Sequence, residues 1–71
     1  MLYNQLKQKN MKTFNIAVLD FGTCQVAMYT GIELDKELDP EAEETFIIDQ
    51  GHNLNNCQWM ISENEISVEY Y

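Results

Sequence analysis

Residues 13–30 carry two alternating β-type segments joined by a short turn, a pattern that requires a β-hairpin. In the first segment Phe14, Ile16 and Val18 recur at every second position, which places them on one face of a strand. Residues 21–24 read Phe-Gly-Thr-Cys, which is typical of a turn, and the second segment then resumes the β pattern. We therefore expect an antiparallel pair of strands.

One helix is expected after the hairpin. Asp39 precedes Pro40, and a side-chain acceptor followed by proline at the first helical position is typical of a helix start. Gly51 suits the left-handed conformation that ends many helices. The expected apolar stripe consists of Ala42, Phe46 and Ile47.

Two further β-type segments follow the helix, in residues 57–61 and 66–71. The second alternates cleanly, with Ile66, Val68 and Tyr70 on one face. The order of elements therefore predicts an α+β fold of the ββαββ type, with a four-stranded antiparallel sheet and one helix packed on one face.

The β pattern begins at Met11, so the sequence predicts a single α+β domain over residues 11–71. Residues 1–10 are mostly polar and are expected to form a flexible or short helical appendage. They lack the apolar core of a signal peptide, and no run approaches the ~18 apolar residues of a membrane span. We therefore expect a cytoplasmic protein with no membrane partner.

Charge restricts the classes of partner. The chain of 71 residues has 4 lysines and no arginine against 12 acidic residues, a formal net charge of −8. From Thr13 onward only Lys36 offsets the acids, whereas nucleic-acid binding depends on clusters of Lys and Arg that neutralise phosphates. We therefore expect no nucleic-acid partner. A core this small contributes only about 3–5 kcal/mol, which favours self-association or a protein partner.

Thiol and zinc chemistry have few candidate residues. Cys24 and Cys57 are far apart, and with His52 as the one histidine they cannot supply a four-ligand zinc site with paired short spacings. We expect two free thiols, with a disulfide or a nucleophilic Cys–His pair as alternatives. Asp20 and Ser62 lie far from the histidine in sequence, so no catalytic triad is indicated. We expect no enzyme activity, metal or cofactor.

Residues 16–26, with the run Asp20-Phe21-Gly22-Thr23, resemble the first phosphate-binding hairpin of the superfamily of actin, heat-shock chaperone and sugar kinase ATPases. In that superfamily the turn wraps phosphates with backbone donors, and the Asp lies near the metal. Those ATPases also need a second hairpin, an adenosine pocket and two lobes, which 71 residues cannot provide. We therefore expect no nucleotide site, although a small ligand at this turn stays open as a third class of function.

A second resemblance covers residues 11–71. The frame of residues 18–26, a helix and then Cys-Gln-Trp-Met-Ile at residues 57–61 resembles small α+β proteins of anaerobic gut bacteria and their mobile elements. This resemblance implies no activity. A modulator encoded by a phage or mobile element is one form of the protein-interaction module that the sequence predicts.

Acidic residues cluster between the second β segment and the helix. A calcium-binding EF-hand loop is not indicated, because Leu38 stands where that loop requires glycine and Pro40 interrupts it. The cluster is either a solvated edge that keeps the domain soluble or a recognition surface for a basic partner. The residues expected to form this surface are Glu33, Asp35, Glu37, Glu41, Glu43 and Glu44.

Aromatic side chains near the C-terminus form the other candidate interaction surface, namely Trp59, Tyr70 and Tyr71. Trp and Tyr are enriched at interface cores, although Trp59 is alternatively the anchor of the hydrophobic core. The sequence therefore predicts a small acidic protein-interaction module that binds a basic partner surface. The alternative is a structural homodimer joined through the sheet, without catalytic activity.

Overall fold

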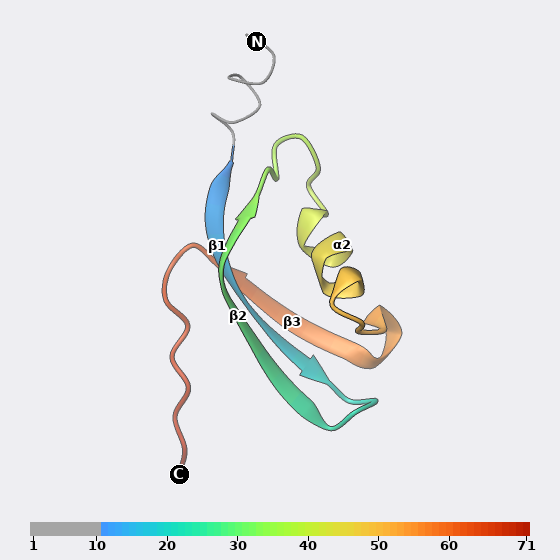
Figure 1. Ribbon diagram of the computed structural model, residues 1–71. Coiled ribbons are helices and arrows are strands. Elements are labelled where there is room, and N and C mark those ends of the chain that lie inside the picture. Colours follow the sequence, from blue (N-terminus) through green and yellow to red (C-terminus); the bar gives the residue numbers. More distant parts are fainter. Residues whose placement is uncertain (1–10) are drawn as a thin grey trace, which may run out of the picture.

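The structure, a computed structural model, describes residues 11–71. It contains an antiparallel three-stranded sheet in the order β2-β1-β3, one α-helix on one side of that sheet, and a short 3-10 helix (Figure 1). The elements are β1 Lys12–Asp20, β2 Gln25–Leu34, α2 Ala42–Asp49, η1 Leu54–Asn56 and β3 Cys57–Ser62. The fold is a small α+β domain, and both the hairpin and the helix are present. The predicted appendage, residues 1–10, lies outside the described residues.

The prediction of a four-stranded sheet is wrong. β3 pairs with the central strand β1, and residues 63–71 form no strand although their sequence alternates. The reason lies where β3 ends: the Asn15 side chain on β1 donates a hydrogen bond to the Asn64 carbonyl (2.8 Å). Asn64 therefore lies beside β1, and none of residues 65–71 pairs with the free edge of β3. The C-terminal segment then extends away from the sheet (Figure 1).

A β-bulge in β2 shifts the alternation of inward-facing residues by one position. Between the pairs Ile16↔Tyr29 and Phe14↔Ile32, β2 has one more residue than β1. Gly31 adopts the left-handed conformation there, with φ of 68°, and its N–H donates to the Asn15 side-chain oxygen (3.2 Å). The extra residue lets both Tyr29 and Ile32 face the helix.

The hydrophobic core lies between the sheet and α2. Ile16 and Val18 of β1 and Ile47 of α2 are fully buried and belong to one cluster. Trp59 is partly buried against this cluster, as expected for a core anchor. The helix therefore covers one face of the sheet, which we call the closed face.

The end of the helix determines where His52 lies. Gly51 has a φ of 97°, its N–H donates to the Ile48 carbonyl (2.9 Å), and the His52 N–H donates to the Ile47 carbonyl (3.3 Å). These two bonds form the Schellman arrangement that the glycine predicts. The chain is thereby turned back toward the sheet immediately after the helix.

Candidate functional site

A buried polar cluster lies at the end of the closed face where β1 ends. Asp20 continues the inward alternation of β1, and its side chain is only 6% exposed. Cys57, the first residue of β3, pairs with Asp20 across the sheet and is also buried. His52 enters from the loop after α2 and Tyr29 from β2, so four separate elements build this cluster.

His52 is held through both ring nitrogens. Its Nδ1 lies 2.6 Å from Oδ2 of Asp20, and its Nε2 lies 2.7 Å from the Tyr29 hydroxyl. A carboxylate only accepts hydrogen bonds, so Nδ1 carries the hydrogen and, in the neutral imidazole, Nε2 accepts from the tyrosine. Among residues 11–71, no buried side-chain nitrogen or oxygen lacks a hydrogen-bond partner. The cluster is therefore satisfied as it stands.

The Asp20 carboxylate also organises the turn after β1. Its Oδ1 accepts hydrogen bonds from the backbone N–H groups of Gly22 (3.0 Å) and Thr23 (3.1 Å). The hydrogen bond from His52, reinforced by these backbone donors, lowers the pKa of Asp20 against the opposing effect of burial. The donors that would wrap a phosphate in the ATPase hairpin are thus occupied by the protein's own carboxylate.

The Cys57 thiol lies next to a negative charge. Burial raises the pKa of this thiol, and the charge of Asp20 raises it further. Nucleophilic cysteines instead need a lowered pKa and an available base. Here the imidazole is engaged by Asp20 and Tyr29, so the geometry does not favour the Cys–His pair. Both cysteines are free thiols, and Cys24 is exposed in the turn after β1.

The sequence reasoning missed this cluster because it counted separation along the chain. The alternation that places Phe14, Ile16 and Val18 on one face continues to Asp20, which was a signal that its carboxylate is buried. A buried carboxylate needs a partner, and the single histidine follows the predicted helix-ending glycine. Those two observations indicate a buried carboxylate and a histidine at the end of the helix, but they do not show that the two side chains meet.

The opposite face of the sheet carries an apolar patch that no element of residues 11–71 covers. Residues paired across antiparallel strands share a face. Ala17 pairs with Met28 and Met60, and Leu19 pairs with Val26 and Gln58, so these six side chains form one patch. We call it the open face: Ala17, Leu19, Val26, Met28, Gln58 and Met60. Leu19, Val26 and Met60 are 41%, 65% and 54% exposed. A hollow of about 210 Å³ lies against this patch along β1 and β3.

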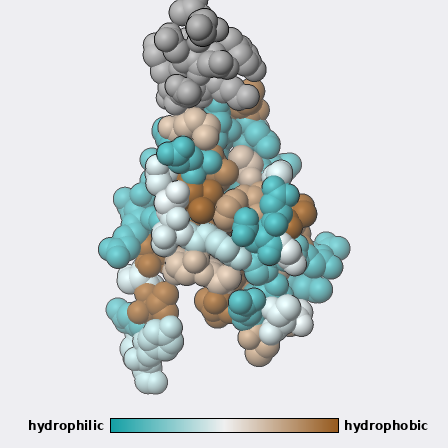
Figure 2. All heavy atoms as spheres, viewed as in Figure 1, coloured by the Kyte–Doolittle hydropathy of each residue, from teal (hydrophilic) through white to brown (hydrophobic). Residues whose placement is uncertain are grey.

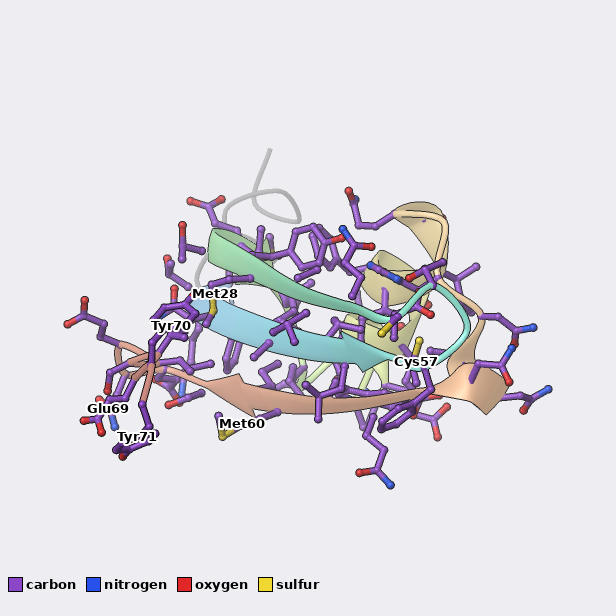
Figure 3. The ribbon with its side chains drawn as sticks, turned by 90° about the horizontal axis from the view of Figure 1, so that it is seen from below. Met28, Cys57, Met60, Glu69, Tyr70 and Tyr71 are labelled. Atoms are coloured by element: carbon purple, nitrogen blue, oxygen red, sulfur yellow. The ribbon has the colours of Figure 1, made fainter. Side chains whose placement is uncertain are left out.

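The C-terminal segment, residues 63–71, lies on the side of the sheet away from α2 (Figure 1). In the space-filling view it stands apart from the rest of the molecule, with an open gap between them (Figure 2). Figure 3 shows Met28 and Met60 on the outer strands, toward the end of the sheet where Tyr70 and Tyr71 also lie. Both tyrosines are almost fully exposed.

The structure places the nine residues of the two predicted interaction surfaces in separate regions (Figure 1). The six acidic residues follow the end of β2, the next turn and the start of α2, whereas Tyr70 and Tyr71 lie at the far end of the C-terminal segment (Figure 1). Glu43 is paired with Lys36, and its side chain is only 12% exposed. The remaining aromatic residue, Trp59, packs against the core on the closed face.

Comparisons with protein families, with curated proteins and with solved structures find no match for this chain. Within residues 11–71, no helix is long and apolar enough to cross a membrane. Arguments about function therefore rest on the polar cluster and the open face.

Proposed function

We propose that the protein is a protein-interaction module and that the open face is its binding surface. The observation that carries this proposal is the exposure of an apolar patch at the middle of the sheet, while the closed face has side chains that are fully buried. Contiguous apolar surface on a small domain is typical of interaction sites. Met28 and Met60 flank the small Ala17, and methionine side chains adapt to partners of varied shape.

The charge of the chain supports a basic partner. The C-terminal segment, which carries Glu65 and Glu69, lies on the same side of the sheet as the open face (Figure 1). A partner that contacts the open face would meet these acids at its rim, where opposite charges accelerate association. We therefore propose a partner segment that presents apolar side chains flanked by Lys or Arg.

A homodimer through the same face is the second candidate. It would cover the exposed apolar side chains of both copies, which the small core favours. However, each copy has a net charge of −8, so two copies repel one another at low ionic strength. The homodimer is therefore expected to need high salt, whereas binding to a basic partner is expected to weaken with salt.

The test compares two substitutions at equally exposed apolar positions. Met60 on the open face is 54% exposed, and Ile48 on α2 is 53% exposed. In pull-downs from host lysate, we expect Met60→Lys to lose proteins that the wild type and Ile48→Lys both retain. Recovery of the same proteins by all three forms, or of none, contradicts a basic partner at the open face. Sedimentation of the wild type as a dimer that Met60→Lys dissociates would favour the homodimer.

A further inference from the structure

The polar cluster brings together three different metal-ligand atoms. A carboxylate oxygen of Asp20, a ring nitrogen of His52 and the sulfur of Cys57 all lie within 4.8 Å of one another. Each side chain is buried and comes from a different element of the fold. We propose that Asp20, His52 and Cys57 bind a divalent transition-metal ion, with Zn²⁺ as the ion that this ligand set fits best.

The separations within the cluster can be compared with those of a tetrahedral zinc site. Zn²⁺ bonds of 2.0–2.3 Å imply that neighbouring ligand atoms lie about 3.3–3.6 Å apart. The present separation of Nδ1 of His52 from Oδ2 of Asp20 is 2.6 Å, so this pair must open by roughly 0.7 Å to admit the ion. The Cys57 sulfur completes a set of three ligand atoms that all lie within 4.8 Å of one another. Asp20 ends a strand and His52 follows a helix, so both can move without breaking the sheet.

Tyr29 gives the cluster a partner that suits both states. Without metal its hydroxyl donates to Nε2 of His52; with metal on Nδ1, the ring hydrogen moves to Nε2 and the hydroxyl oxygen accepts it. A ligating histidine usually donates its other N–H to such a partner, which fixes the orientation of the ring. The backbone N–H groups of Gly22 and Thr23 hold the Asp20 carboxylate in the same way.

Binding is balanced by the loss of one proton. The Asp20 carboxylate binds as the anion, and for a neutral imidazole no proton is released, because its hydrogen only moves from Nδ1 to Nε2. The Cys57 thiol gives up its proton to solvent as sulfur bonds to the ion. Three protein ligands leave a fourth position for water, so this site differs from the four-ligand zinc sites that the sequence spacing excludes.

Cobalt(II) is the probe for this site, because thiolate ligation gives a near-ultraviolet charge-transfer band and tetrahedral geometry gives intense visible bands. The full-length chain, reduced and freed of metal with a chelator, is titrated with Co²⁺ and then with Zn²⁺. We expect one Co²⁺ per chain with both sets of bands, which one equivalent of Zn²⁺ removes.

The two cysteines provide a matched control. Cys57→Ser should lose the charge-transfer band, whereas Cys24→Ser, which changes the exposed thiol of the turn, should keep it. Tyr29→Phe keeps all three ligands and should weaken binding by about 10–100-fold. Circular dichroism shows which variants remain folded.

Three outcomes would overturn the proposal. The first is Co²⁺ binding without the charge-transfer band, which would indicate only the carboxylates of the acidic surface. The second is a band that survives Cys57→Ser or disappears in Cys24→Ser. The third is the absence of any bands from the wild type at micromolar protein with excess Co²⁺.

Discussion

Val18 and Leu19 are neighbours in β1, yet they belong to two faces with different roles. Val18 is fully buried on the closed face, whereas Leu19 is 41% exposed on the open face. Side chains of similar size and polarity thus contribute differently according to which face the strand presents. On the closed face burial stabilises the fold, and on the open face the same apolar surface stays available to a partner.

The largest expected difference in the free energy of unfolding is between substitutions of two adjacent isoleucines in α2. Ile47 is fully buried in the core, and Ile48 is 53% exposed. Ile47→Ala should lower the free energy of unfolding by about 2–5 kcal/mol, because it leaves a cavity in the core. Ile48→Ala should change it by less than about 0.5 kcal/mol. Urea unfolding followed by Trp59 fluorescence measures both, and similar losses in the two variants would show that the closed face is not the core.

The second effect concerns the bulge that turns Tyr29 and Ile32 toward the closed face. Gly31 has a φ of 68° and open space around its Cα, so Gly31→Ala should cost about 1–2 kcal/mol through backbone strain alone. Gly22→Ala is the control, because Gly22 lies outside the positive-φ region and an added Cβ would meet its nearest atom at 3.4 Å. Thermal melts of both variants make the comparison. If Gly22→Ala is the more damaging, the bulge does not determine which residues face inward.

A smaller effect is expected on the open face. Met60→Lys and Leu19→Lys should each change the free energy of unfolding by less than about 0.5 kcal/mol, because both side chains already contact solvent. This result would separate loss of partner binding from loss of folding in the pull-down. A loss above about 2 kcal/mol would instead place Leu19 or Met60 in a second hydrophobic core.

Local signals in the sequence predicted the hairpin and the helix, because a turn and a helix end depend on adjacent residues. The fourth strand was wrong for the converse reason: alternation in residues 66–71 permits a strand but does not supply its pairing partner. In the structure the chain after β3 is instead contacted by the Asn15 side chain, which donates to the Asn64 carbonyl, and these residues are far apart in sequence. An expected strand therefore needs an edge to pair with as well as a pattern.

The polar cluster also has one feature that local sequence signals predict and others that depend on the tertiary structure. The burial of Asp20 follows from the alternation of β1, which is a local signal. The inward position of Tyr29 depends on the bulge at Gly31, and the contact with His52 depends on how the chain turns after α2. Neither of those could be predicted from residue spacing. The open face is intermediate: a single helix on one face of the sheet was predicted, but the strand pairing was needed to show which side chains lie on the uncovered face.

The smallest expected effect on the free energy of unfolding concerns the acidic cluster, which lies far from the C-terminal tyrosines. It compares an acid in an ion pair with exposed acids of the same cluster. Lys36 Nζ lies 2.5 Å from Glu43 Oε1, whereas Glu37 and Glu41 are exposed acids of the same cluster. Glu43→Gln should lower the free energy of unfolding by about 0.2–1 kcal/mol, because it removes a partly shielded ion pair. The double variant Glu37→Gln/Glu41→Gln should instead raise it by a few tenths of a kcal/mol, because it reduces repulsion between like charges.

Measuring stability and association rate at two salt concentrations tests this last comparison further. The screening length falls from about 10 Å at 0.1 M salt to about 3 Å at 1 M, so the gain in the double variant should disappear at high salt. If the acids also steer a basic partner, the double variant should associate more slowly at low salt and at an unchanged rate at high salt. An on-rate that is unchanged at both salt concentrations, together with the stability gain, would assign these acids to solubility. Recognition would then depend on the open face and on the acids of the C-terminal segment.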